Sequence, residues 1–162
     1  MSKKLYTIGH GNLAFVDFLK LLRKYQINLV IDLRSVPWSK YVPHFNKNNL
    51  QKKLKDEGFE YIYFGDKLGG RPNQGWSKYY ISEEYKKNIK KLEEIVNGKK
   101  STILCSESDY KKCHRNSVAQ TMTERGYKVF HILKDGTLDL NSMRDLEFTH
   151  QLSLSAFTGG KV

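Results

Sequence analysis

Short apolar segments with strand character alternate with longer segments of helical periodicity along most of this chain. Strands are predicted over 4–8, 29–33, 59–64, 102–104 and 128–133, and helices over 15–25, 46–57, 81–96 and 113–125. Such alternation is typical of parallel strands joined by helical crossovers. We therefore expect an α/β fold: a single three-layer domain with a mostly parallel five-stranded sheet and helices on both faces.

The alternation stops after Leu133. We expect residues 1–134 to form the α/β domain and residues 135–162 to be a C-terminal extension. Whether residues 138–140 form a short edge strand, and whether the extension packs on the same domain, stay open. Glycines mark the connections: Gly58 suits the left-handed end of helix 46–57, and residues 65–76, with four glycines and a proline, predict a long loop. Asn12 is the predicted cap of the first helix.

The chain is strongly basic, with 28 Lys and Arg against 17 Asp and Glu and a formal net charge of +11. This excess favours a polyanionic partner such as nucleic acid, or an anionic small molecule. The alternative, a lysine-rich solvated surface, stays open because many lysines fall on the outer faces of predicted helices.

Two cysteines cannot build a disulfide framework, and no apolar segment approaches the ~20 residues that span a bilayer. The N-terminus runs directly into a predicted strand without a signal-peptide core. We therefore expect a cytoplasmic protein without a membrane partner. The sequence indicates no cofactor.

Polar and reactive side chains follow the ends of the predicted strands. They are His10 after the first strand, Asp32 and Arg34 at the second, Arg71 in the loop after the third, and Cys105 and Glu107 at the fourth. The carboxyl ends of parallel strands share one edge of the sheet, where open α/β folds build their sites. These residues, joined by the Cys113-His114-Arg115 segment, are therefore expected to line one cleft.

The side chains suggest individual roles. Cys105 is a candidate nucleophile, because a following helix and nearby cations lower a thiol pKa, although free cysteines are often small buried hydrophobes. Glu107 is a candidate proton carrier, with an ion pair to Arg115 as the alternative. The predicted catalytic residues are Cys105, Glu107, His10 and His114, and the predicted substrate-binding residues are Asp32, Arg34, Arg71 and Arg115.

The two cysteines have three other possible uses. A phosphate loop of the cysteine-phosphatase or rhodanese kind is disfavoured, because the loop after Cys105 carries two acids and no glycine. Cys105, Cys113, His114 and His10 fit no common zinc spacing, so no metal is expected. Neighbouring helical residues point about 100° apart, so Cys113 is expected to pack inward. A Cys105–Cys113 disulfide stays open.

Several of these motifs together resemble a known family. They are Thr7-Ile8-Gly9-His10, Asp32-Leu33-Arg34-Ser35-Val36-Pro37, Phe45-Asn46, Leu68-Gly69-Gly70-Arg71, Cys105-Ser106-Glu107, Cys113-His114-Arg115 and His131-Ile132. With this spacing the chain resembles the bacterial and archaeal domain-of-unknown-function family numbered 488. The resemblance implies a shared pocket that includes Cys113 beside the eight residues above, and it implies no particular reaction.

The site and the charge together favour an enzyme that acts on an anionic substrate, such as a nucleotide or a nucleic-acid base. A transferase or hydrolase with a Cys/Glu active site would fit this expectation. The alternative is a non-catalytic module that binds nucleic acid or senses a ligand. The sequence gives neither the strand order nor the oligomeric state.

Overall fold

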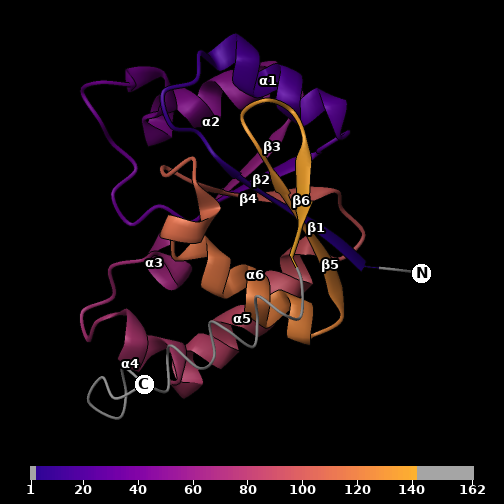
Figure 1. Ribbon diagram of the computed structural model, residues 1–162. Helices are drawn as coiled ribbons and strands as arrows, with labels where there is room; N and C mark the ends of the chain where they lie inside the picture. Colours follow the sequence, from indigo (N-terminus) through magenta and orange to yellow (C-terminus); the bar gives the residue numbers. More distant parts are fainter. Residues whose placement is uncertain (1–2, 142–162) are drawn as a thin grey trace.

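The computed structural model describes residues 3–141, which form a six-stranded sheet with helices on both faces (Figure 1). The strands are β1 (Lys3–Gly9), β2 (Leu29–Asp32), β3 (Glu60–Tyr63), β4 (Ser101–Cys105), β5 (Tyr127–Ile132) and β6 (Leu138–Leu140). Their order is β3-β2-β4-β1-β5-β6. All neighbouring strands are parallel except β5 and β6, which are antiparallel.

The helices divide between the two faces of the sheet. They are α1 (Phe15–Lys24), α2 (Lys47–Asp56), α3 (Gly65–Leu68), α4 (Trp76–Tyr80), α5 (Glu83–Val96) and α6 (Arg115–Glu124), with short 3-10 turns η1 (Pro43–Phe45) and η2 (Tyr110–Lys112). Side chains of α1, α2 and η1 share one apolar core, and those of α3 to α6 share the other. The predicted three-layer α/β architecture is confirmed.

The two cores follow from alternation along strands that are buried on both sides. In β2, Leu29 and Ile31 point toward the α5 and α6 side, while Val30 points toward α1 and α2. The same alternation in β4 places Ile103 and Cys105 on one side and Leu104 on the other. Continuous apolar runs of this kind are typical of central strands in a doubly covered sheet.

The sheet has one strand more than the predicted five. Residues 135–141 turn back at Asp135, whose carboxylate accepts a hydrogen bond from the Thr137 amide, and continue as the antiparallel edge strand β6. The start of the predicted extension is therefore part of the sheet. Residues 142–162 of that extension lie outside the described residues.

Local predictions had mixed outcomes. Gly58 ends α2 in the left-handed region with φ of 88°, as expected. Asn12 does not cap the first helix, because α1 begins later and its cap position is Ala14, which has no side-chain acceptor. The predicted loop 65–76 contains the short helix α3 and reaches the start of α4.

A crevice forms where successive connections leave the sheet toward opposite faces. The segments after β1 and β2 lead to α1 and α2, whereas the segment after the intervening strand β4 leads to α6 on the other face. Ligand sites of open α/β sheets lie at such points, beyond the carboxyl ends of the strands. Within residues 3–141, no helix is long and apolar enough to cross a membrane.

Candidate functional site

A cavity of about 300 Å³ opens beyond the carboxyl ends of β2 and β4, and we refer to it as the cysteine cavity. Its lining residues are Arg34, Ser35, Val36, Gly70, Arg71, Cys105, Ser106, Glu107, Lys112, Cys113 and His114. It gathers five of the eight predicted site residues, together with Cys113. The other three, His10, Asp32 and Arg115, do not line it.

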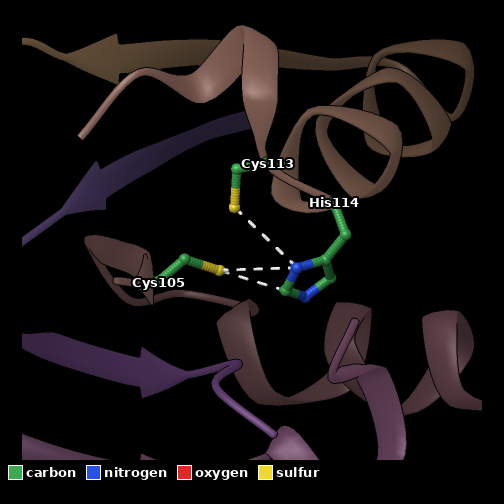
Figure 2. Close-up of side chains that lie close together, drawn as sticks. All are labelled: Cys105, Cys113 and His114. Atoms are coloured by element: carbon green, nitrogen blue, oxygen red, sulfur yellow. Dashed lines mark hydrogen bonds between the residues drawn. The ribbon is translucent and has the colours of Figure 1, made fainter. Parts of the chain in front are cut away.

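The two sulfur atoms and one imidazole nitrogen meet at the base of this cavity. The Sγ atom of Cys105 lies 4.0 Å from Nδ1 of His114, and the Sγ atom of Cys113 lies 3.8 Å from the same nitrogen. Figure 2 shows the Cys113 sulfur directed toward Nδ1, whereas the Cys105 sulfur lies beside the ring at similar distances from both nitrogens, 3.9 Å from Nε2. We refer to these three residues as the Cys-Cys-His cluster.

Cys113 and His114 face the cavity together because Cys113 precedes the helix. It has φ of −124° and ψ of 144°, an extended conformation, and α6 begins only at Arg115. The expectation that Cys113 packs inward is therefore corrected: the buried thiol is Cys105, which is 2% exposed, whereas Cys113 is half-buried. The sequence-based helix boundary was too early by two residues.

The His114 ring is held by neighbours on three sides. Its Nε2 atom lies 3.0 Å from the carbonyl oxygen of Leu68, and Trp76 packs edge-on with ring centroids 5.2 Å apart. Because a carbonyl only accepts, Nε2 carries the proton, and the unprotonated Nδ1 is the ring nitrogen nearest to the Cys113 sulfur. A Cβ at Gly70 would lie 2.7 Å from Nδ1, so only glycine lets this loop approach the ring.

The pKa values of the two thiols are shifted in opposite directions. Burial raises the pKa of Cys105 well above its usual value. The hydrogen bond from the Cys105 thiol lowers the pKa of Cys113, and the charge and backbone amide of Arg115 lower it further. Cys113 is therefore the more acidic of the two thiols, which argues against Cys105 as the nucleophile.

Arg115 is fully buried and does not line the cavity. Its guanidinium donates hydrogen bonds to the carbonyl oxygens of Glu107 and Ser108 and to the hydroxyl of Thr7 in β1. The expected substrate clamp is therefore corrected: Arg115 ties the loop after β4 to the sheet. The structure also shows no ion pair between Arg115 and the Glu107 carboxylate among the described residues.

Asp32 is buried beneath the cavity and orients Arg34. Its carboxylate accepts from Nε of Arg34 at 2.9 Å, from Nη2 at 2.7 Å, and from the Tyr61 hydroxyl at 2.6 Å. This bidentate pair fixes the guanidinium, which is only 5% exposed, at the wall of the cavity. Asp32 thus acts through Arg34 and does not itself line the cavity.

His10 lies behind Arg34, on the α1 side of the sheet. Its ring stacks on Phe45, its Nδ1 donates to the Gly11 carbonyl, and its Nε2 accepts from Nη1 of Arg34 at 3.3 Å. Burial lowers the pKa of His10 to about 4, so the imidazole is neutral at neutral pH. The structure places His10 as a support for Arg34 and gives it no access to the cavity.

The mouth of the cavity carries exposed charges of both signs. Glu107 is exposed, and its carboxylate accepts a hydrogen bond from the Asp109 amide. Arg71 and Lys112 are exposed lining residues, and the backbone of Arg71 is fixed by its amide, which donates to the Ser35 hydroxyl. Arg71 also lines an adjoining cavity of about 400 Å³.

Sequence reasoning missed how several residues shape this site. Tyr61, Trp76 and Ser35 hold Asp32, His114 and the Arg71 loop, respectively. No local pattern marks Tyr61 or Trp76, because their partners are distant in the chain. The adjacent glycines 69 and 70 did carry a signal, since such pairs often permit close backbone approach.

A second cationic surface lies at the opposite edge of the sheet, beside the amino ends of the parallel strands. A cavity of about 1020 Å³ there is lined by the start of β1, the end of α5 and the segment before β4. Its charged lining residues are Lys3, Lys4, Lys90, Glu93, Glu94, Lys99, Lys100 and Arg125. Positive charge is therefore not confined to the cysteine cavity.

The chain belongs to the family described as a domain of unknown function, DUF488, whose model matches residues 14–122. The match contains the Cys-Cys-His cluster, Arg34 and Arg71 but begins after His10. The family resemblance drawn from the motifs is confirmed. No curated protein and no solved structure matches the chain.

Proposed function

We propose that this protein is an enzyme that acts on an anionic substrate, with a nucleotide or a nucleic-acid base as the favoured class. The observation that carries the proposal is the composition of the cysteine cavity. Cations at its wall and mouth surround a reactive sulfur and imidazole cluster at its base. Such convergence of polar and reactive groups in one concave site is characteristic of enzyme active sites.

Each lining residue has a role consistent with its position. Arg71 and Lys112, both exposed at the mouth, would bind the anionic group, and Arg34 would contribute from the wall. The Cys-Cys-His cluster is the reaction centre, and the Glu107 carboxylate is close enough to the mouth to exchange protons with solvent. Arg71 lines two adjoining cavities, so a phosphate held there leaves room for a sugar or base beside it.

The test measures binding and turnover separately. Nucleoside monophosphates, nucleoside triphosphates and short single-stranded oligonucleotides are titrated against the wild type, Arg71→Ala and Lys112→Ala. A charge-assisted hydrogen bond contributes about 1.5–3 kcal/mol, so losing Arg71 should weaken binding at least about tenfold. Lys78→Ala, an exposed residue of α4 outside the cavities, is the matched control.

Turnover of the bound compound is then followed by product analysis. The wild type should convert it, and Cys113→Ser should bind it without converting it. Affinity that is unchanged in both Arg71→Ala and Lys112→Ala would contradict the assignment of the cavity. Stoichiometric binding without product would instead favour a non-catalytic module.

The cationic surface at the opposite edge supports that second candidate, a nucleic-acid-binding module. In that case affinity for single strands should fall with salt by a log–log slope of about 0.7 per phosphate contact. Lys4→Ala and Lys90→Ala, which line that surface, should reduce the slope while Arg71→Ala leaves it unchanged. The two sets of variants therefore separate the two functions.

A further inference from the structure

The Cys-Cys-His cluster has the composition of a metal site, although its sequence spacing does not. We propose that Cys105, Cys113 and Nδ1 of His114 bind one zinc ion, with the fourth coordination position open to the cysteine cavity. The three ligand atoms all lie within 4.8 Å of one another. The fold brings Cys105 from the end of β4 to the two adjacent residues that precede α6.

The distances are close to those of a tetrahedral site. Zinc–sulfur bonds of about 2.3 Å and zinc–nitrogen bonds of about 2.0 Å place ligand atoms roughly 3.5–3.8 Å apart. Nδ1 of His114 lies 3.8 Å from the Cys113 sulfur and 4.0 Å from the Cys105 sulfur, which is also 3.9 Å from Nε2. Small side-chain rotations toward a common centre therefore suffice to bring the three ligand atoms to these separations.

The hydrogen bond of His114 prepares it to be a ligand. A metal-binding imidazole commonly donates its other N–H to a carbonyl or carboxylate, which fixes the tautomer and the ring orientation. Here Nε2 is 3.0 Å from the Leu68 carbonyl, and this leaves Nδ1 unprotonated on the side of the sulfurs. The ring cannot swing freely, because Trp76 and Gly70 pack against it.

The cysteines are also supported as ligands. Cys105 ends a strand that pairs on both sides, so its sulfur is held by a rigid part of the sheet. The sulfur of Cys113 lies 3.5 Å from the amide nitrogen of Arg115, a donor that stabilises a thiolate. Two thiolates balance the charge of a divalent ion, and a set of two thiolates and one imidazole suits zinc better than magnesium or calcium.

Three protein ligands with an open fourth position are typical of catalytic zinc, whereas structural zinc has four. All three members of the cluster line the cysteine cavity, so the open position faces the anion-binding residues. His10 cannot fill it, because its Nε2 faces Arg34. A water molecule or a substrate atom would complete the tetrahedron. Only this last step, the use of the open position, rests on the proposed function.

Metal content tests the proposal without any assay of activity. The full chain is purified under reducing conditions without chelators and analysed for zinc by mass spectrometry. We expect one zinc per chain in the wild type and in Ser106→Ala, a matched control next to Cys105. We expect less than about one tenth of that content in Cys105→Ser, Cys113→Ser and His114→Ala, because each removes one of three ligands.

Cobalt provides a second measurement that does not depend on the variants folding. Cobalt(II) added to reduced, zinc-stripped wild-type protein should give thiolate-to-cobalt charge transfer and the visible bands of a tetrahedral site, and zinc should displace them. Circular dichroism checks that each variant keeps the wild-type fold. Folded variants that hold as much zinc as the wild type would overturn the assignment.

Two further outcomes would also overturn it. One is a wild type that contains no zinc and gives no cobalt spectrum after reduction. The other is a protein that is purified without metal and with a Cys105–Cys113 disulfide, seen as a loss of two hydrogens by intact mass. Zinc without turnover would contradict the proposed function alone, and turnover by a metal-free protein would contradict this inference alone.

Discussion

The guanidinium of Arg115 donates a hydrogen bond to the backbone carbonyl of Glu107, and it does so from a fully buried position. Arg115 follows the cavity residues Cys113 and His114 in the sequence, but its guanidinium binds the loop that shapes the cavity and does not face a ligand. The loop's two carbonyls at Glu107 and Ser108 both depend on this one side chain. This relationship makes Arg115 a structural residue of the site.

Replacing Arg115 should destabilise the protein strongly. Arg115→Met keeps the apolar volume but leaves the carbonyls of Glu107 and Ser108 without their buried donor, while Thr7 keeps its hydrogen bond to His131, so the free energy of unfolding should fall by about 3–5 kcal/mol. Urea denaturation measures this change. Lys52→Met, on the exposed face of α2, is the control and should change stability by less than about 0.5 kcal/mol. A fall as small as the control's would refute the structural role.

Replacing Asp32 should destabilise the protein about as strongly as replacing Arg115. Asp32→Asn removes the charge that partners the nearly buried Arg34, and breaking a buried pair costs about 3–5 kcal/mol. Tyr61→Phe removes only one hydrogen bond to this carboxylate and should cost about 1–3 kcal/mol. Thermal or urea unfolding compares both with Asp56→Asn at the exposed end of α2. Equal losses in the two test variants would contradict this ranking.

Gly70 should be needed for the position of His114. Gly70→Ala introduces a methyl group 2.7 Å from Nδ1 and 2.9 Å from Cγ of the ring, and the ring must move away from the sulfurs. Zinc affinity, measured by competition with a chelating dye, should fall by about 10–100-fold, as for other changes that misplace a ligand. The control is Gly98→Ala, where a Cβ meets nothing within 4 Å, and it should leave the affinity unchanged despite its φ of 74°. Normal zinc affinity in Gly70→Ala would argue against His114 as a ligand.

The two cysteines should alkylate in an order opposite to that expected from the sequence. In reduced, metal-free protein, iodoacetamide should modify the half-buried Cys113 at least about tenfold faster than Cys105, which is 2% exposed. Peptide mass spectrometry at successive times distinguishes the two sites. Zinc should slow the reaction of both, and unfolding in guanidinium should abolish the difference. Faster labelling of Cys105 would restore it as the accessible thiol.

The layer architecture was predictable because it depends on periodicity along short segments. Runs such as Leu29-Val30-Ile31 are typical of doubly buried strands, and the helices between them favour parallel pairing. The sixth strand was harder to predict, since β6 is short and its partner β5 supplies the pairing. The strand order also depends on contacts between distant segments, which no local pattern records.

The site was predictable as a location but not as an arrangement. The ends of β2 and β4 do bring Arg34, Cys105 and Glu107 to one edge. Whether a charge faces solvent or the interior depends on partners elsewhere in the fold, as Arg115 shows with Thr7. The shared orientation of Cys113 and His114 depends on the extended conformation of one residue before α6. Helix boundaries are uncertain by one or two residues, so the sequence could not predict this conformation.

The central position of β4 in the sheet determines which parts of the site can change during evolution. Cys105 is anchored between two neighbouring strands, while Cys113 and His114 stand at the far end of a surface connection. Substitutions at the exposed positions of that connection, such as Glu107 and Lys112, would reshape the mouth without disturbing the sheet, since exposed side chains contribute little to stability. Proteins with this fold can therefore come to bind different ligands while the sulfur of Cys105 keeps its position.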